Sequence, residues 1–96
     1  MLTIPRIREI VTPICRQYGV QRTYLFGSYA RGEATEQSDV DLRIEPGRIH
    51  SLLVLSAFRL DLVDALGKEV DVVSALPEDE EFRRELSRDE VLLYAA

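Results

Sequence analysis

The stretch YLFGSYARGEATEQSDVDLRI, residues 24–44, decides the fold of this 96-residue chain because two strand-like segments enclose a polar middle. Residues 20–26 are rich in strand-forming side chains and end at Gly27, whereas residues 39–45 alternate apolar and polar side chains before a Pro–Gly turn. Residues 28–32 have the length of one helical turn. The stretch therefore predicts two strands joined by a helical turn and a polar loop.

Two longer helices and a third strand are predicted around this stretch. Apolar residues at helical spacing predict a helix over 4–18, and a run rich in Leu, Val and Ala predicts another over 48–66. Residues 69–73, EVDVV, predict the third strand. The order of these elements favours a single domain over residues 1–96, of the α/β (α+β) class, in which helices flank a small β-sheet.

The C-terminal tail is predicted to be helical. After Pro77, acidic residues come first and arginines follow, which matches the dipole of a helix. Ser87 and Glu90 form the capping-box pattern directly before the apolar residues 91–94. The tail is therefore predicted to form either one helix or two short helices.

Charge and composition narrow the class of function. The chain has 17 acidic side chains against 12 lysines and arginines, a net charge of -5, so we do not expect it to bind nucleic acid directly. No apolar run has the length of a membrane span, and no signal-like run precedes Pro5, so a cytoplasmic location is expected. The single cysteine, Cys15, excludes an intrachain disulfide and is expected to be a buried thiol.

Two aspartates at the start of the predicted strand 39–45 indicate a metal site. Alternate side chains of a strand share one face, so Asp39 and Asp41 are expected about 7 Å apart at the backbone, with Val40 facing the opposite way. Two carboxylates this close repel unless a cation lies between them, and oxygen-only ligands favour Mg²⁺ or Mn²⁺. A solvated strand face is the alternative for an isolated pair of this kind.

A third carboxylate, Asp71, lies between two valines of the third predicted strand. A charge in an apolar strand is costly unless it is paired or binds a metal, and Arg43 or Lys68 would be the alternative partner. If the two strands are neighbours, Asp71 joins Asp39 and Asp41. Three carboxylates on a sheet suit a two-metal site for phosphoryl chemistry.

The Gly27–Ser28 pair supplies a candidate phosphate site. Free backbone N–H groups at a turn after a strand bind phosphate, glycine allows a close approach, and the Ser28 hydroxyl adds a donor. Arg31, about one helical turn along, and Arg43, on the strand face of the two aspartates, are assigned as nucleotide contacts. Taken singly, a Gly–Ser pair is typical of a turn and an arginine of a solvated or ion-paired side chain, so the inference rests on the combination.

That combination resembles a known family. Gly27–Ser28, ten intervening residues, Asp39 and Asp41, and finally Asp71 are similar to the signature of the minimal nucleotidyltransferase (MNT) domain of the DNA polymerase beta superfamily. The resemblance extends over nearly the whole chain. It implies a polymerase-beta-like nucleotidyltransferase core with a small mixed β-sheet flanked by helices.

The resemblance also implies roles for these residues. A nucleoside triphosphate, ATP, would bind with its outer phosphates on Gly27 and Ser28. Two Mg²⁺ ions would be held by Asp39 and Asp41. Asp71 would hold one of these ions and help to deprotonate the hydroxyl that attacks the α-phosphate.

A partner is implied in the same way. Small members of the family resemble the antitoxins of HEPN/MNT toxin–antitoxin pairs, whose partner is a helical HEPN ribonuclease toxin encoded by the adjacent gene. The implied activity is transfer of AMP to a tyrosine of that toxin. The apolar segment 48–66 is interpreted as a docking surface for a homo- or hetero-oligomer. The alternatives are a nucleotidyltransferase for small molecules such as aminoglycosides, and a non-enzymatic antitoxin that masks its partner.

Overall fold

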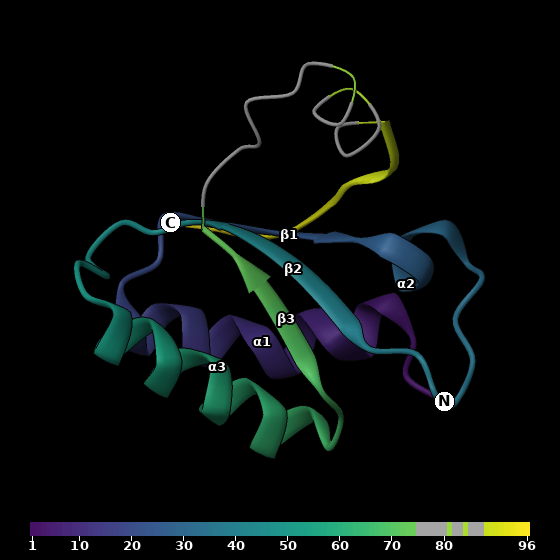
Figure 1. Cartoon of the computed structure of the whole chain (residues 1–96), viewed down its shortest axis with the longest axis horizontal. Coiled ribbons are helices and arrows are strands. Elements are labelled where there is room, and N and C mark those ends of the chain that lie inside the picture. Colours follow the sequence, from purple (N-terminus) through teal and green to yellow (C-terminus); the bar gives the residue numbers. More distant parts are fainter. Residues whose placement is uncertain (75–80, 82–83, 85–87) are drawn as a thin grey trace.

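The computed structural model describes residues 1–74, 81, 84 and 88–96, and these form a sheet of four strands with helices on one of its faces (Figure 1). The elements are α1 (Ile4–Tyr18), β1 (Arg22–Phe26), α2 (Gly27–Arg31), β2 (Val40–Glu45), α3 (Leu52–Leu66), β3 (Val70–Val73) and β4 (Val91–Ala95). The strand order is β3-β2-β1-β4. Strand β2 is antiparallel to β1 and parallel to β3, and β4 is antiparallel to β1, so the sheet is mixed, as expected.

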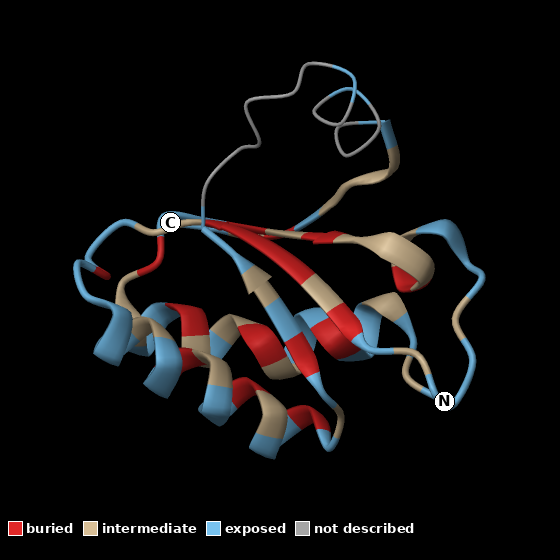
Figure 2. Cartoon of the chain, viewed as in Figure 1, coloured by how far each residue is buried: buried red, intermediate tan, exposed pale blue. Residues whose placement is uncertain are grey.

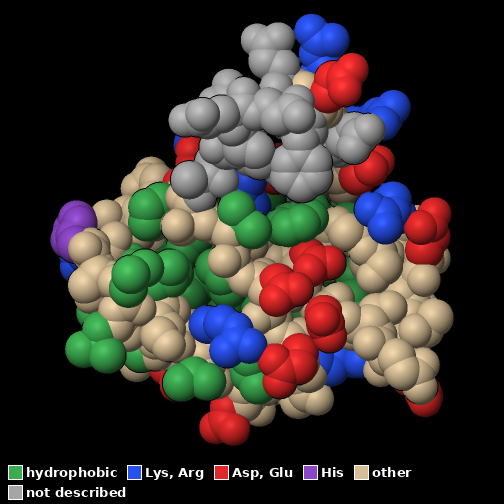
Figure 3. Space-filling model, in the orientation of Figure 1, with side chains coloured by type: hydrophobic (Ala, Val, Ile, Leu, Met, Phe, Trp, Pro, Cys, Tyr) green, Lys and Arg blue, Asp and Glu red, His purple; other side chains and the backbone are tan. Residues whose placement is uncertain are grey.

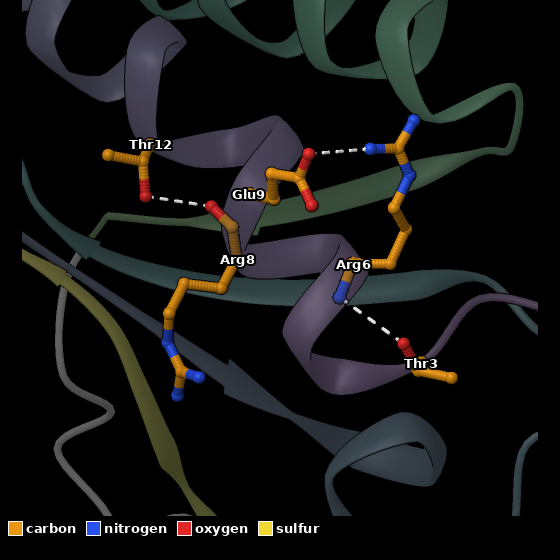
Figure 4. Close-up of polar contacts among 5 residues, drawn as sticks. All are labelled: Thr3, Arg6, Arg8, Glu9 and Thr12. Carbon is orange, nitrogen blue, oxygen red and sulfur yellow. Dashed lines mark hydrogen bonds and ion pairs between the residues drawn. The ribbon is translucent and has the colours of Figure 1, made fainter.

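Both long helices begin and end where side chains and glycines cap them. The Thr3 hydroxyl accepts a hydrogen bond from the Arg6 amide at 3.2 Å and opens α1 (Figure 4), and Gly19 ends the helix in the left-handed region at φ 70°. Helix α3 begins four residues later than the predicted 48, because Ser51 is its cap and accepts from the amide of Val54. Residues 48–50, predicted to be helical, instead continue the turn that begins at Pro46–Gly47.

The core lies between the sheet and the two long helices (Figure 2). The alternating pattern of β2 is confirmed, since Val40, Leu42 and Ile44 are buried against the helices. Cys15 of α1 is also fully buried, as predicted, with its Sγ 3.1 Å from the Thr23 Oγ1 of β1. The opposite face of the sheet therefore carries the other set of β2 side chains, which includes Asp41.

The prediction of a helix at residues 91–94 was wrong, because this segment is the edge strand β4. Leu93 faces the core and is buried, while Leu92 is exposed, which is the alternation of a strand. Pairing with β1 thus overrides the capping-box pattern, and Glu90 of that pattern binds Arg43 instead. The helix predicted directly after Pro77 falls largely outside the described residues.

Each edge of the sheet has a backbone carbonyl covered by an arginine from a helix. Arg8 of α1, whose side chain extends toward the sheet in Figure 4, donates to the Leu92 carbonyl of β4 at 3.0 Å. Arg59 of α3 donates to the Val70 carbonyl of β3 at 2.8 Å. Across the described part of the chain, no helix has the length and apolarity needed to cross a membrane.

Candidate active site

The sheet places two of the three predicted carboxylates side by side. Strands β2 and β3 are neighbours, as the sequence interpretation required, and their parallel register pairs Asp41 with Asp71. Both side chains leave the sheet on the face opposite the helices, because Val40 and Val70 point into the core. The Asp41 and Asp71 carboxyls lie close enough to share a hydrogen bond. This pair is the centre of the candidate site.

Asp39 lies at the entrance to β2, one residue before the strand begins, and is exposed. Its negative charge reaches Asp41, where it is one of the influences that raise the carboxyl pKa. Asp39 therefore acts on Asp41 through its charge alone, whereas Asp71 also lies within hydrogen-bond distance of Asp41. Figure 3 shows acidic side chains gathered near the middle of the molecular face drawn there.

The electrostatics of the pair are those of a site prepared for positive charge. The pKa of Asp41 is raised to about 6, chiefly by burial and then by the neighbouring charge of Asp71, a hydrogen bond to Asp71 and the charge of Asp39. The Arg31 guanidinium acts in the opposite direction and so lies within electrostatic reach. Near neutral pH the ionised carboxylates repel one another, and a bound cation would remove that repulsion.

The site requires a glycine at position 27, because any side chain there would force neighbouring atoms to move. Its φ is 73°, and a Cβ atom at this position would overlap the Oδ2 atom of Asp41. Gly27 opens α2, so the helical turn begins directly against the Asp41 carboxylate, with Ser28 half-buried beside it. The predicted phosphate-binding pair and the carboxylate pair are thus parts of one site.

The two predicted arginine contacts differ in their availability. Arg31 is exposed and forms an ion pair of 3.1 Å with Glu33 at the surface. The Arg43 guanidinium binds both oxygens of Glu90, at 2.5 and 3.0 Å, and both side chains are about nine-tenths buried. Its guanidinium carbon also lies 4.3 Å from the ring centre of Tyr24. Arg43 is therefore on the predicted face of the sheet, but its Nε and Nη2 groups are already engaged by Glu90.

Sequence reasoning assigned no role to two residues that border the site. Lys68 was considered only as an alternative partner for Asp71, yet its ammonium group donates to backbone carbonyls of the polar loop before Asp39. Tyr29 of α2 is buried, and its hydroxyl finds no hydrogen-bond partner among the described residues. A contact to a backbone carbonyl leaves no side-chain pattern in the sequence, which is why the role of Lys68 was not predicted.

The donor set fits a divalent cation in its chemistry. The site offers carboxylate oxygens without histidine or cysteine, which is the ligand set that Mg²⁺ and Mn²⁺ prefer. Within residues 1–74, 81, 84 and 88–96, however, no three His, Cys, Asp or Glu side chains lie close enough together to form a ready metal cage. Asp41 and Asp71 form the assembled part of the predicted site, and Asp39 is the ligand that would complete it.

Comparison with known proteins defines the class. Residues 9–96 match the family of polymerase beta nucleotidyltransferases, and the chain belongs to this family. It is therefore an enzyme of the nucleotidyltransferase class. A solved structure at 33% identity, described provisionally as a minimal nucleotidyltransferase, superposes with a TM-score of 0.77 and covers 94% of this chain and 95% of its own. The predicted fold class is thereby confirmed.

Two curated relatives narrow the resemblance. A Methanocaldococcus jannaschii protein, provisionally named a protein adenylyltransferase, is 44% identical over 73 residues, which are 76% of this chain and 78% of the relative. The protein adenylyltransferase MntA of Thermococcus cleftensis is 40% identical over 77 residues, covering 76% and 78% of the two chains.

Two more distant structures share the fold. A toxin–antitoxin structure with AMP-PNP has a TM-score of 0.77 at 21% identity and covers 93% of this chain and 73% of the other. A tri-AMPylated Shewanella oneidensis HEPN toxin in complex with its MNT antitoxin gives a TM-score of 0.71 at 18% identity, covering 98% and 74%.

Proposed function

We propose that this chain is a Mg²⁺-dependent protein adenylyltransferase that transfers AMP from ATP to a tyrosine hydroxyl of a partner HEPN ribonuclease toxin, and so acts as its antitoxin. The observation that carries the proposal is the Asp41–Asp71 carboxyl pair directly against Gly27. In this proposal residues 1–96 form one catalytic domain that works in the cytoplasm. The protein adenylyltransferase relatives support the choice of AMP and of a protein acceptor.

In the proposed reaction the acceptor oxygen forms a bond to the α-phosphorus of ATP while the bond from that phosphorus to the bridging oxygen breaks. Pyrophosphate leaves, and the proton of the hydroxyl passes to Asp71. When bound, two Mg²⁺ ions would neutralise charge on the attacking and leaving oxygens. Asp39 and Asp41 would hold both ions, and Asp71 would hold one of them.

The other site residues bind the nucleotide. The backbone N–H groups of Gly27 and Ser28, with the Ser28 hydroxyl, bind the outer phosphates. Arg31 contacts a phosphate after it leaves Glu33, because an exposed ion pair is worth little and is easily exchanged. Arg43 reaches the nucleotide only if its buried pair with Glu90 opens, which is costly. Arg31 is therefore the stronger of the two arginine assignments.

The start of α3 is the proposed contact with the toxin. Leu52 and Leu53 are 84% and 82% exposed, and Figure 3 shows hydrophobic side chains over this part of the molecule. A groove of about 210 Å³ beside them is lined by Pro46, Ile49, His50, Ser51, Leu52, Leu55 and Ser74. The net charge of -5 complements a basic RNA-cutting partner. The toxin–antitoxin structures of the same fold support this choice of partner.

The test is AMP transfer to the product of the adjacent gene. The chain, ATP, Mg²⁺ and that protein are mixed, and the partner is weighed intact. We expect the added mass of AMP with the wild type and none with the Asp39→Asn/Asp41→Asn variant, while Asp64→Asn, a change on the exposed face of α3, behaves as wild type. Full neutralisation of the toxin by the double variant would favour masking, and turnover of an aminoglycoside without transfer to protein would favour a small-molecule acceptor.

A further inference from the structure

Lys68 lies among the three chain segments that carry the candidate active-site residues. It is the only lysine in the sequence and is placed between α3 and β3, three residues before Asp71. Its Nζ donates to the carbonyl of Glu36 at 2.6 Å and to that of Ser38 at 3.2 Å. The same Nζ lies 6.0 Å from the ring centre of Tyr29. One ammonium group thus contacts both the polar loop and α2.

The contacts of Lys68 act on the backbone at Asp39. The Ser38 carbonyl belongs to the peptide group before Asp39, and Lys68 binds it. The next peptide group is held as well, because the Val40 amide donates to the Glu69 carbonyl at 3.0 Å. Two consecutive residues, Lys68 and Glu69, therefore fix the peptide groups on both sides of Asp39. What remains free at this position is the rotation of the carboxylate side chain.

The loop that Lys68 binds is braced from within. The Thr35 amide donates to the Ser38 Oγ at 2.8 Å, and the Ser38 amide donates to the Thr35 carbonyl at 3.1 Å. These bonds make residues 35–38 a compact turn, but they do not connect it to the sheet. Lys68 makes that connection from the segment that also leads to Asp71.

The third contact of Lys68 reaches the phosphate side of the site. Tyr29 is the second residue after Gly27, and its ring is buried. A cation near the face of an aromatic ring is attracted to it, and at 6.0 Å this is the weakest of the three contacts. An ammonium group has three donors on a rotatable stem, so it can serve two carbonyls and a ring from one point.

We propose that Lys68 is a positioning residue, which holds the backbone of Asp39 beside Asp41 and Asp71, so that rotation of the Asp39 side chain brings the third carboxylate onto a divalent cation bound by the other two. The inference rests on the proposed function, because it takes these aspartates as the metal ligands. It assigns to Lys68 a role through the backbone of a ligand, with no contact to substrate. Groups that orient metal ligands typically change metal affinity or activity about 10–100-fold when they are removed.

Arg59 provides a matched control. It also donates to the start of β3, from its Nε to the Val70 carbonyl at 2.8 Å, and it forms an ion pair with Glu69 at 2.9 Å. These contacts lie on the outer edge of the sheet, and none of them reaches the polar loop or α2. Arg59→Met therefore removes a cation and a backbone hydrogen bond near Lys68 without releasing Asp39.

The experiment uses Mn²⁺ alone as the probe and compares Lys68→Met, Lys68→Arg and Arg59→Met with the wild type. We expect Lys68→Met to weaken Mn²⁺ binding, measured by electron paramagnetic resonance, by about 10–100-fold. The amides of Ser38 and Val40 should exchange with solvent faster in that variant. Lys68→Arg, which keeps the charge and the donors, should recover part of both losses, and Arg59→Met should show neither.

Unchanged Mn²⁺ affinity or unchanged amide exchange in a folded Lys68→Met protein would overturn the role of Lys68. Equal losses in Arg59→Met would overturn it too, since they would reflect general loosening of β3. Neither measurement needs nucleotide or toxin. If the wild type transferred no AMP, the proposed function would fail, while Mn²⁺ binding and exchange would still decide the role of Lys68.

Discussion

Gly27 shows how one missing side chain determines the geometry of the site. Of the glycines with positive φ, it alone would place a Cβ atom against a carboxylate of the candidate active site, whereas Gly32 has the same φ of 73° and nothing within 4 Å of its Cβ position. Comparing alanine variants at the two positions therefore distinguishes the effect of backbone strain from the effect of crowding Asp41. A left-handed conformation costs an alanine roughly 1–2 kcal/mol, and this cost is common to both.

We expect Gly32→Ala to lose about 1–2 kcal/mol of stability in urea unfolding, and Gly27→Ala to lose at least as much, because its methyl group also displaces the Asp41 side chain. Only Gly27→Ala should also lose Mn²⁺ affinity and AMP transfer, because its methyl group displaces the Asp41 carboxylate. Isothermal titration with Mn²⁺ and the mass of the modified partner are the measurements. An active Gly27→Ala protein would show that Asp41 can move without loss of function.

The raised pKa of Asp41 leads to a prediction about how the stability of the protein depends on pH. This pKa is raised from the ordinary 3.8 to about 6, mainly by burial and then by Asp71. Between about pH 4 and 6 the folded protein holds more protons than the unfolded chain, so this carboxyl lowers stability as the pH rises, and its penalty is complete above about pH 6. Below about pH 4 the carboxyl is protonated in both states and the penalty is absent.

Asp41→Asn should therefore stabilise the metal-free protein at pH 8, by an amount on the order of 1–2 kcal/mol after allowance for solvent screening, and have no effect near pH 4. Urea unfolding at the two pH values in the presence of a chelator measures this. The same variant should no longer bind Mn²⁺. If Asp41→Asn instead lost stability at pH 8, the prediction would be wrong, because the ionised carboxylate would then be stabilising the fold.

At the scale of elements, the ion pair between Arg43 and Glu90 joins β2 to the residue that precedes β4. The sequence placed β2 and Asp41 correctly, because a strand with one buried face has a clear alternation, whereas Asp39, predicted within the strand, lies one residue before it. It failed at β4, because the five residues Val91–Ala95 are a strand only when the edge of β1 is available to them. The capping-box pattern misled the prediction because Glu90 pairs with a distant arginine and does not cap a helix at this point.

Breaking this pair should be costly in a way that an exposed pair is not. Arg43→Met leaves the Glu90 carboxylate buried without its cation, which should cost about 3–5 kcal/mol, and the double variant Arg43→Met/Glu90→Met should recover most of the loss. Arg22→Met, which breaks the exposed pair with Glu45 on the same sheet, should cost less than about 1 kcal/mol. Thermal unfolding of the four proteins decides this, and an Arg43→Met loss no larger than that of Arg22→Met would contradict it.

At the scale of the whole molecule, the fold class and the meeting of Asp41 with Asp71 followed from patterns within single strands and from the expected neighbourhood of β2 and β3. The contacts of Lys68 could not be predicted, because its side chain binds the backbone carbonyls of Glu36 and Ser38, which are 32 and 30 residues away in the sequence. The occupation of Arg43 by Glu90 was hidden for the same reason. The meeting of Asp41 with Asp71 could thus be predicted, and the contacts of Lys68 and Glu90 around it could not.

The arginines at the two edges of the sheet bear on how a partner can approach. A common way to join two proteins is to add a strand from one to the open edge of a sheet in the other, through a ladder of backbone hydrogen bonds. Here Arg8 already occupies a carbonyl of β4, and Arg59 occupies one of β3. An incoming strand would have to displace a helix-borne cation at either edge. Strand addition at either edge would therefore cost one of these hydrogen bonds, whereas a contact through exposed side chains would not.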